Sequence, residues 1–560
     1  LPPTPSQLQR FLDDDRPGAF VRLVDRLLAS PRYGERWGRH WLDVAGYADS
    51  EGYTNDDRVR PYAYKYRDYV IRAFNDDKPF NRFTVEQLAG DLLPKGPDGF
   101  PLESNLVATG FHRNTMTNNE GGTDDEEFRT AALIDRVNTT WEVWQGTTFG
   151  CIQCHSHPYD PIPHQDYYRY LAFFNNTRDE DVWDDWPKLR YYQGEDSVRV
   201  ERLKDWVRTY NPAQVPFFTQ FLRVMEPKIN AHHFIRGEQS TALLISHYGI
   251  KDKGNARIAA VDLTGVGSVV MQVITRAERA ELTLRRDRPD GPILATLPIP
   301  TRDTVLVAPI ASAPGKHDIF LSLSSPKNPA EWVRITYAAF QPALPGAEQP
   351  GYADRLADYA SLLTRPTDGL PVLWEGTGDF ARKTHVFERG NWLVKGAEVQ
   401  PGIPALFPPL PSNAPRNRLG MAQWLVSRDN PLTARVIVNR FWEQLFGRGI
   451  VETVEDFGSQ GSEPTHRELL DWLAVRFMEE DQWRVKKLLK RLVMSATYRQ
   501  TTVSDPQKQR EDPYNYWLAR GPRVRLSAEQ IRDQVLAAAG LLSPTMYGPS
   551  VMPPQPDGIW

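Results

Sequence analysis

The chain has 560 residues, which is enough for about three domains with cores of their own. Its 67 lysines and arginines nearly balance its 71 aspartates and glutamates, so the net charge of -4 gives no basic field that would attract nucleic acid. No window approaches the apolar length of a transmembrane helix, and the start at Leu1 has neither a signal-peptide pattern nor a methionine, as we expect of a processed or trimmed chain.

Residues 1–226 have the apolar periodicity of helices. Within them, a capping box at 123–126 predicts the start of a helix that ends at Gly146. Its predicted apolar face consists of Phe128, Ala131, Ile134, Val137, Trp141 and Trp144. We interpret these tryptophans as core packing, which is compatible with their also forming the wall of a cofactor site.

Directly after this helix comes Cys151-Ile152-Gln153-Cys154-His155, which holds the only two cysteines of the chain. Two thiols at this spacing followed by histidine are typical of c-type haem attachment. Cys151 and Cys154 can each add to a haem vinyl group, and His155 can bind the iron as proximal ligand. The motif predicts one covalent haem c and, because such haem is attached outside the cytoplasmic membrane, a periplasmic or otherwise extracytoplasmic location.

A redox disulfide, a zinc half-site or an inert cysteine pair are the alternatives. A thioredoxin-like pair should open a helix within a βαβ unit, and this one follows a helical region rich in tryptophan. A structural zinc site would need a second ligand pair, for which only His157 and His164 are near in sequence.

The sixth iron ligand would decide the chemistry. His157 is too close in sequence to His155 to reach the opposite haem face. The candidates for the distal ligand are His112, Met116 and His164, or a residue farther along the chain.

His112 and Arg113 form a candidate catalytic pair, because an imidazole and a guanidinium above an open iron could handle peroxide or a substrate proton. The alternative is that His112 packs in the core and that Arg113 pairs with an acidic residue. The acidic residues considered are Glu120, Asp124 and Asp125.

A second possible ion site is the acidic cluster of Asp49, Glu51, Asp56 and Asp57. It could hold calcium, but its spacing departs from the EF-hand pattern, so a solvated loop is the favoured interpretation.

From residue 229 to 345 the apolar period changes to two, in runs such as 268–274 and 318–323 with a turn at 287–292. Short strands at this spacing predict a β-sandwich inserted between helical regions. After a proline-rich stretch at 401–411, residues 350–560 are expected to form a mainly helical C-terminal domain with capping boxes at Thr465 and Ser527. The expected fold class is multidomain α+β.

With the haem motif extended to Cys151–Pro161, the sequence resembles the planctomycete cytochrome-c-associated family, which are large secreted proteins. The resemblance also rests on segments 33–43, 108–115, 120–123, 134–140, 430–436 and 455–461. The family usually has a further cytochrome-like domain before the position of Leu1 and more sequence after that of Trp560. We therefore expect this chain to be part of a longer precursor, or to meet a further chain or subunit beyond Trp560.

The inserted region is similar to carbohydrate-binding modules of family six, through Gly315–Leu321 and the turn at 290–292. Trp332 and Tyr337 are candidates for stacking on sugar by residue type alone. A sandwich that only separates the helical regions is the alternative.

The chain has no nucleophile elbow, phosphate-binding glycine loop or metalloprotease histidine pair. We therefore expect an exported c-type haem protein with redox function, and favour an oxidoreductase acting on carbohydrate that the sandwich presents. One alternative is a monohaem electron-transfer protein serving a redox partner protein. The other is a non-enzymatic carbohydrate-binding or structural assembly protein in which haem supports the fold.

Overall fold

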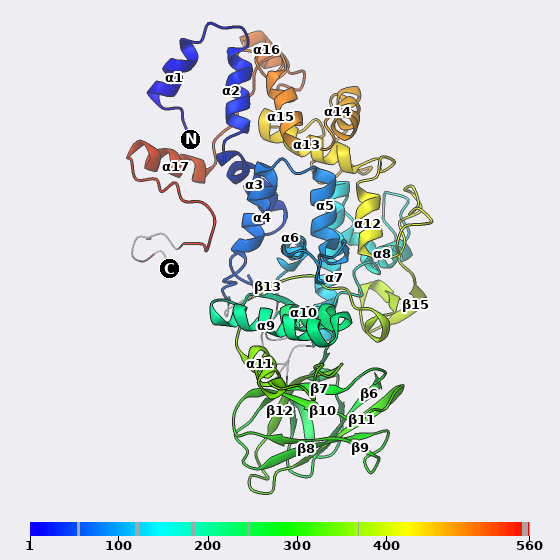
Figure 1. Ribbon diagram of the computed structural model, residues 1–560. Coiled ribbons are helices and arrows are strands. Elements are labelled where there is room, and N and C mark those ends of the chain that lie inside the picture. Colours follow the sequence, from blue (N-terminus) through cyan, green and yellow to red (C-terminus); the bar gives the residue numbers. More distant parts are fainter. Residues whose placement is uncertain are drawn as a thin grey trace.

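A computed structural model describes residues 1–52, 57–117, 124–180, 185–243, 247–367, 369–503, 505–551 and 558. Helices form an elongated body, and an antiparallel β-sandwich lies at one end of it (Figure 1). The expected multidomain α+β fold class is confirmed. Among the described residues, no helix is both long enough and apolar enough to cross a membrane.

The first part of the body is built from helices that bury one face each. They are α1 Pro5–Leu12, α2 Ala19–Leu28, α3 Arg32–Val44, α4 Tyr64–Asn75, α5 Phe80–Ala89, α6 Glu103–Ala108, α7 Asp125–Thr140 and α8 His164–Leu171. Helices α3 and α4 pack side by side, and Trp41 of α3 lies among Phe80, Phe83 and Trp144. These aromatic contacts form the centre of the core that supports the cysteine segment.

Helix α7 leads into that segment. Its N-cap is Asp124, whose side chain accepts hydrogen bonds from Glu126 N and Glu127 N, whereas the Thr123 of the expected capping box lies outside the described residues. After Thr140 the helix continues as a π-helical turn, Trp141–Gln145, and Gly146 ends it at φ 51°. A left-handed residue at this position commonly closes a helix, so the predicted end at Gly146 is confirmed.

The buried face of α7 differs from the predicted apolar face. Val137, Trp141 and Trp144 are buried as predicted, but Ala131 is exposed. The helix also buries Arg129, Leu133 and Arg136, which the prediction did not include. The two arginines can be buried because each pairs with a carboxylate, Arg129 with Glu126 and Arg136 with Asp179. Apolar periodicity gives no information on such ion pairs.

The sandwich consists of two antiparallel sheets. One has the order β10-β7-β12-β5-β4 with β2 also paired to β12, and the other has the order β3-β6-β11-β8-β9. The strands are β2 Ile229–Asn230, β3 Ile235–Arg236, β4 Ser240–Leu243, β5 His247–Ile250, β6 Asn255–Asp262, β7 Ser268–Ile274, β8 Ala280–Arg286, β9 Ile293–Ile299, β10 Thr304–Pro309, β11 Lys316–Ser324 and β12 Val333–Gln341. The predicted turn at 287–292 joins β8 to β9.

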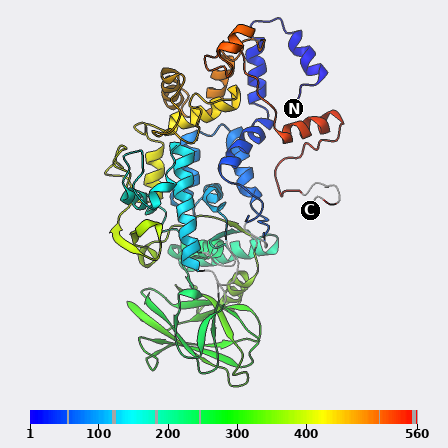
Figure 2. The ribbon, with the colours of Figure 1, turned by 180° about the vertical axis from the view of Figure 1, so that it is seen from behind.

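Strand β7 shows why this sandwich also contacts helices. Val269, Met271 and Val273 face the core between the sheets, while Val270 on the opposite face packs against a helical layer. That layer is formed by α9 Glu195–Tyr210, α10 Val215–Val224 and α11 Tyr352–Thr364, which lie between the sheets and the body (Figures 1 and 2). Both faces of the strand are therefore apolar, rather than alternating between core and solvent.

The chain leaves the body and returns to it at one place. Strand β1, Lys188–Arg190, pairs antiparallel with β13, Gly369–Pro371. Everything between these strands, including the helical layer and the sandwich, is thus an insertion whose two ends are hydrogen-bonded neighbours.

The C-terminal helices pack on the first part of the body. They are α12 Arg418–Leu425, α13 Thr433–Phe446, α14 Arg467–Glu479, α15 Val485–Met494, α16 Pro506–Glu511 and α17 Ala528–Ala538. The capping box at Ser527 is confirmed, but α14 begins after His466 without a side-chain cap, because the Thr465 hydroxyl donates to Ile450 O instead. One hydrophobic cluster runs from Tyr33 to Leu492, so the two helical regions share a core.

Candidate functional site

The two cysteines lie on one short turn at the surface. Cys151 belongs to the 3-10 helix Gly150–Gln153, and Cys154 follows as its C-cap. Both thiols are free and exposed, whereas Ile152 between them is fully buried. The turn is therefore fixed from inside by an apolar side chain and presents two sulfur atoms to the outside.

An aromatic floor supports this turn. Phe149 stacks on Trp141, with ring centroids 4.0 Å apart and planes 5° from parallel. Tyr170 and Phe407 contact Trp141 edge-on at 5.2 and 5.3 Å. These rings are core packing, and they hold the residue before Gly150 in place.

His155 is exposed, and its Nδ1 lies 2.7 Å from the carbonyl oxygen of Ser156. A carbonyl can only accept, so Nδ1 carries the proton and Nε2 retains its lone pair. Metal-binding histidines are commonly oriented in this way by a backbone carbonyl.

The predicted distal candidate His164 is committed to the same turn. Its Nε2 donates to Gln153 O at 3.0 Å, and the Tyr168 hydroxyl donates to that oxygen at 2.7 Å. Both side chains come from α8 and fix the carbonyl before Cys154. His164 is thus a support of the cysteine turn, and its Nε2 is not directed at an iron on the far side of it.

The hairpin of β14 Thr384–Phe387 and β15 Lys395–Val399 covers one side of Cys154. Gly390 at its tip has φ 75°, and a Cβ there would lie 2.9 Å from Cys154 Sγ. Exposed Leu393 and Val394 follow on the same hairpin. Because Gly390 has no side chain, there is room beside the Cys154 thiol, next to the apolar surface of Leu393 and Val394.

The loop after the cysteines is held by the C-terminal part of the chain. Asp160 N donates to His157 Nδ1 at 2.8 Å, and Asp160 Oδ1 accepts from Ser459 N at 3.0 Å. Phe457 N donates to Gly146 O at 2.6 Å, on the other side of the cysteines. Two segments that carry the family resemblance, 151–161 and 455–461, therefore form one structural unit, which sequence reasoning did not predict.

The structure places His112 and Arg113 away from this turn. His112 is buried, with Nε2 donating to Thr140 Oγ1 at 3.1 Å, and its burial moves its pKa well below the ordinary value, so that the ring stays neutral. Arg113 pairs with Asp179 at 3.0 Å, where Arg136 also binds, instead of with the acidic residues expected. Of those, Glu120 lies outside the described residues. The pair therefore serves the core and does not form an acid–base group near the cysteines.

Met116 is 61% exposed and shares a small pocket with Phe128 and Ala132 near the start of α7. The cysteine turn follows the other end of α7, so among the described residues this pocket and the turn are lined by different segments.

The described part of the acidic cluster organises its own loop. Gly52 N donates to Asp57 Oδ1 at 2.8 Å, and the Asp49 carboxylate accepts from the Tyr47 hydroxyl. Asp56 lies outside the described residues. Glu51 of the same cluster is buried, so the described part of this loop is not wholly solvated.

The geometry of the cysteine turn bears on whether it suits zinc, a redox disulfide or covalent haem. Among the described residues, the one group of three or more potential metal ligands is elsewhere and contains neither cysteine, so a zinc site at this turn has no complete ligand set. Burial of its inner side, together with Asp160 and Cys154, raises the pKa of the Cys151 thiol. Reactive redox cysteines show the opposite shift. Two accessible thiols, an oriented imidazole and a glycine beside one sulfur do fit covalent haem attachment.

Residues 1–179 match the family model PSCyt2, a protein of unknown function (DUF1549). Residues 417–560 match the family model PSD1, a protein of unknown function (DUF1553). Both are names of the planctomycete cytochrome-c-associated family that the sequence motifs resemble. The matched segments are those that share the core of the body, and the insertion lies between them.

No curated protein matches the chain. Solved structures similar to the sandwich include a family 6 carbohydrate-binding module from Clostridium cellulolyticum with xylose (17% identity, TM-score 0.19, 20% of this chain and 96% of that one). Others are CsCBM6-3 from Clostridium stercorarium with cellobiose (19%, 0.19, 21% and 94%) and a β-1,3-glucan-binding module from Bacillus halodurans (16%, 0.19, 20% and 95%). At these values the likenesses carry no functional argument.

The two aromatic residues suggested for sugar stacking are poorly placed for it. Tyr337 is 3% exposed and packs under the helical layer, and Lys251 Nζ covers the Trp332 ring at 4.4 Å. The buried Tyr337 ring cannot offer its face to a saccharide, and Lys251 occupies one face of the Trp332 ring.

A different cavity, of about 320 Å³, lies where the sandwich meets the body. Its rings are Trp374 and Phe380, and its carboxylates are those of Glu226, Glu375, Asp379 and Asp262. Arg178 lies over Phe380, 4.3 Å from the ring centroid, and pairs with Glu226 at 3.0 Å. Sequence reasoning missed this cavity because its walls come from segments far apart in the chain.

Proposed function

We propose that this protein carries one haem c on Cys151 and Cys154, with His155 as the proximal iron ligand, and that it acts in electron transfer. The observation that carries the proposal is the geometry of the turn, which exposes both thiols and leaves the lone pair on His155 Nε2.

Each residue of the turn has a distinct part in holding the group. The two thiols would hold the haem through thioether bonds, while Ile152 anchors the turn and the Ser156 carbonyl orients the His155 ring. When bound, haem c supplies one-electron exchange at its iron. Because the turn lies at the surface, a partner protein could approach it closely.

The enzymatic version, an oxidoreductase acting on carbohydrate, is less well supported. It needs an acid–base group at the haem, and the pair suggested from sequence, His112 and Arg113, is bound within the core. Electron exchange with a redox partner protein needs no such group. The location we propose is extracytoplasmic, since that is where haem c is attached.

The test is production of the protein in a host that exports it and attaches haem, followed by intact mass and a pyridine haemochrome spectrum. We expect a mass increase of one haem and a c-type spectrum. Cys151→Ala and Cys154→Ala should each lose covalent haem, and Met116→Ala should keep both mass and spectrum. An unmodified mass, from cells in which a co-produced reference cytochrome c is fully loaded, would refute the proposal.

A second candidate function, saccharide binding, is favoured by the cavity between sandwich and body. The half-buried Phe380 ring, several carboxylates and a guanidinium are groups that can contact and hydrogen-bond to a sugar. Calorimetry with xylo- and gluco-oligosaccharides tests it. We expect Phe380→Ala to abolish binding and Trp332→Ala to leave it unchanged, and the reverse result would place binding on the sheet instead.

A further inference from the structure

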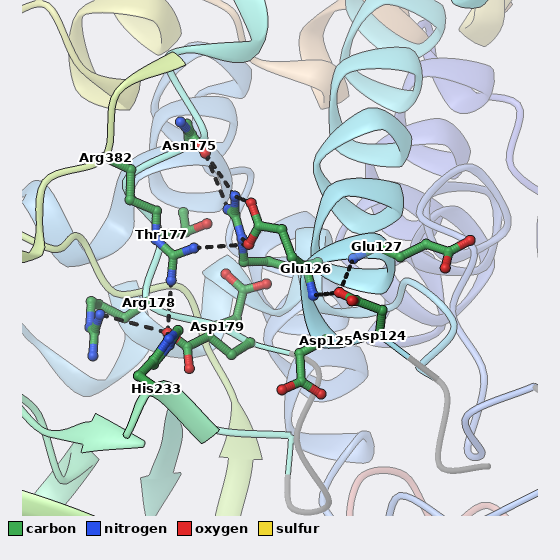
Figure 3. Close-up of polar contacts among 12 residues, drawn as sticks. Asp124, Asp125, Glu126, Glu127, Asn175, Thr177, Arg178, Asp179, His233 and Arg382 are labelled. Atoms are coloured by element: carbon green, nitrogen blue, oxygen red, sulfur yellow. Dashed lines mark hydrogen bonds and ion pairs between the residues drawn. The ribbon is translucent and has the colours of Figure 1, made fainter. Parts of the chain in front are cut away.

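Three potential metal ligands converge where the sandwich joins the body. They are Glu180, which follows α8, and His232 and His233 of the 3-10 helix Ala231–His233. One ligand atom of each lies within 4.8 Å of those of the other two. Figure 3 shows Asp125 at the start of α7 and His233 on a separate segment near Arg178. This group is unrelated to the cysteine turn and is not used by the function proposed above.

The spacing of the ligand atoms suits a tetrahedral cation. His232 Nε2 lies 3.2 Å from Glu180 Oε2, and His233 Nε2 lies 3.1 Å from Glu180 Oε1. Bonds of roughly 2.0–2.1 Å to zinc place tetrahedral ligands about 3.3–3.4 Å apart. One imidazole nitrogen thus lies beside each oxygen of the Glu180 carboxylate, at a spacing close to that of zinc ligands.

The carboxylate of Asp125 lies near the second ring nitrogen of His232. His232 Nδ1 is buried, has no hydrogen-bond partner, and lies 3.5 Å from Asp125 Oδ2. A histidine that binds a metal through Nε2 commonly donates its Nδ1 proton to such a carboxylate. If Asp125 Oδ2 moved slightly closer, it would accept a hydrogen bond from His232 Nδ1 and fix the orientation of the His232 ring.

The charges around the group leave a place for a cation. Three buried or half-buried arginines are each paired with a glutamate: Arg129 with Glu126 at 2.8 Å, Arg178 with Glu226 at 3.0 Å, and Arg382 with Glu180 at 2.7 Å. Asp125 has no arginine partner among these pairs. The Asp125 carboxylate therefore adds a negative charge beside His232 that no arginine of these three pairs offsets.

Glu180 itself is held in position. It is almost fully buried, and Asn230 Nδ2 donates to its Oε2 at 2.6 Å while Arg382 binds Oε1. His233, by contrast, is 48% exposed. The buried carboxylate is preorganised, and the open side of the group faces solvent at His233.

We propose that Glu180, His232 and His233 bind one divalent cation of the zinc class, with Asp125 orienting His232 and a fourth position open to water. Two imidazoles and a carboxylate are a ligand set that zinc uses in proteins. The cation would tie the start of the sandwich to the helical body, since its ligands come from both.

Zinc titration of the chelator-treated full chain by calorimetry tests the proposal, with His233→Asn as the main variant. His233 is half-exposed, so its replacement should leave the fold intact, which near-UV circular dichroism checks. We expect wild-type protein to bind one more equivalent of zinc than the variant. Zinc held by the cysteines contributes equally to both proteins, so the difference reports this site alone.

Two further variants separate a metal site from an ion-pair network. Asp125→Asn should weaken zinc binding by about 10- to 100-fold, as loss of a carboxylate behind a metal-bound histidine does. His317→Ala removes another histidine–carboxylate pair, His317 with Asp287 at 3.0 Å, and should leave binding unchanged. Zinc should also raise the unfolding temperature of the wild type but not of His233→Asn. Equal zinc binding by wild type and His233→Asn, or none by either, would overturn the proposal.

Discussion

The replacement Arg418→Met tests how strongly the C-terminal region is fixed to the rest of the body. Arg418 is completely buried at the start of α12. Its Nη2 binds Asp91 Oδ2 at 2.6 Å and Glu375 Oε2 at 2.9 Å, and its Nη1 donates to Leu88 O at 3.0 Å. One guanidinium thus connects three separate segments of the chain.

The expected cost follows from what methionine leaves behind. The side chains of Asp91 and Glu375 are 2% and 8% exposed, and both would remain buried without a cation. Breaking a buried ion pair by removing one partner costs about 3–5 kcal/mol. Arg428→Met is the matched control, because its partner Glu479 is exposed and such surface pairs contribute about 0–1 kcal/mol.

Urea unfolding followed by tryptophan fluorescence measures the loss of stability of Arg418→Met and Arg428→Met in the helical body. Trp332 is the single tryptophan between residues 229 and 345, so the signal reports mainly the helical body and not the sandwich. We expect a lower urea midpoint at an unchanged slope, which indicates lost stability and not a changed unfolding reaction. A loss below about 1 kcal/mol for Arg418→Met, equal to that of the control, would refute the reasoning, because the carboxylates would then not depend on this cation.

Three further predictions concern the cysteine turn and the helix α3. Gly390→Val should lower haem loading, measured by intact mass, because its side chain would collide with Cys154 Sγ, while Gly378→Val on open surface should not. Phe149→Ala should destabilise the body by about 3–5 kcal/mol in the same urea assay, since it removes a buried ring stacked on another; an effect near zero would show that the floor is not rigid. Burial and neighbouring arginines lower the pKa of His40 to about 4, whereas the ordinary value near 6.5 applies when unfolded. Between these pH values the unfolded chain binds more protons than the folded one, so the free energy of unfolding should fall as the pH drops from about 6.5 to 4. Above about pH 6.5 this contribution should be fully present. His40→Gln should reduce the slope of the urea midpoint against pH.

The sequence predicted the parts of the fold that depend on local pattern. The end of α7 at Gly146 and the turn between β8 and β9 followed from glycine and turn residues, and both are confirmed. Arg136 was missing from the predicted buried face because it is buried by pairing with Asp179, a partner far along the chain. Apolar periodicity contains no information on such pairs.

The site was predictable to a similar extent. The spacing of Cys151, Cys154 and His155 indicated the chemistry, since these residues act from one turn. The supports from Gly390 and Ser459 could not be predicted, because they arrive from segments hundreds of residues later. The same holds for Glu180 and His233, which no sequence spacing connects.

The pairing of β1 with β13 has a consequence for how such chains diversify. Lys188 lies opposite Pro371, so the polypeptide enters and leaves the inserted segment through adjacent residues. An insertion whose ends already meet can be lengthened, shortened or exchanged with a small entropic cost of closing the loop. The inserted segment can therefore change in length or sequence while the pairing of β1 with β13, and with it the helical body, stays the same.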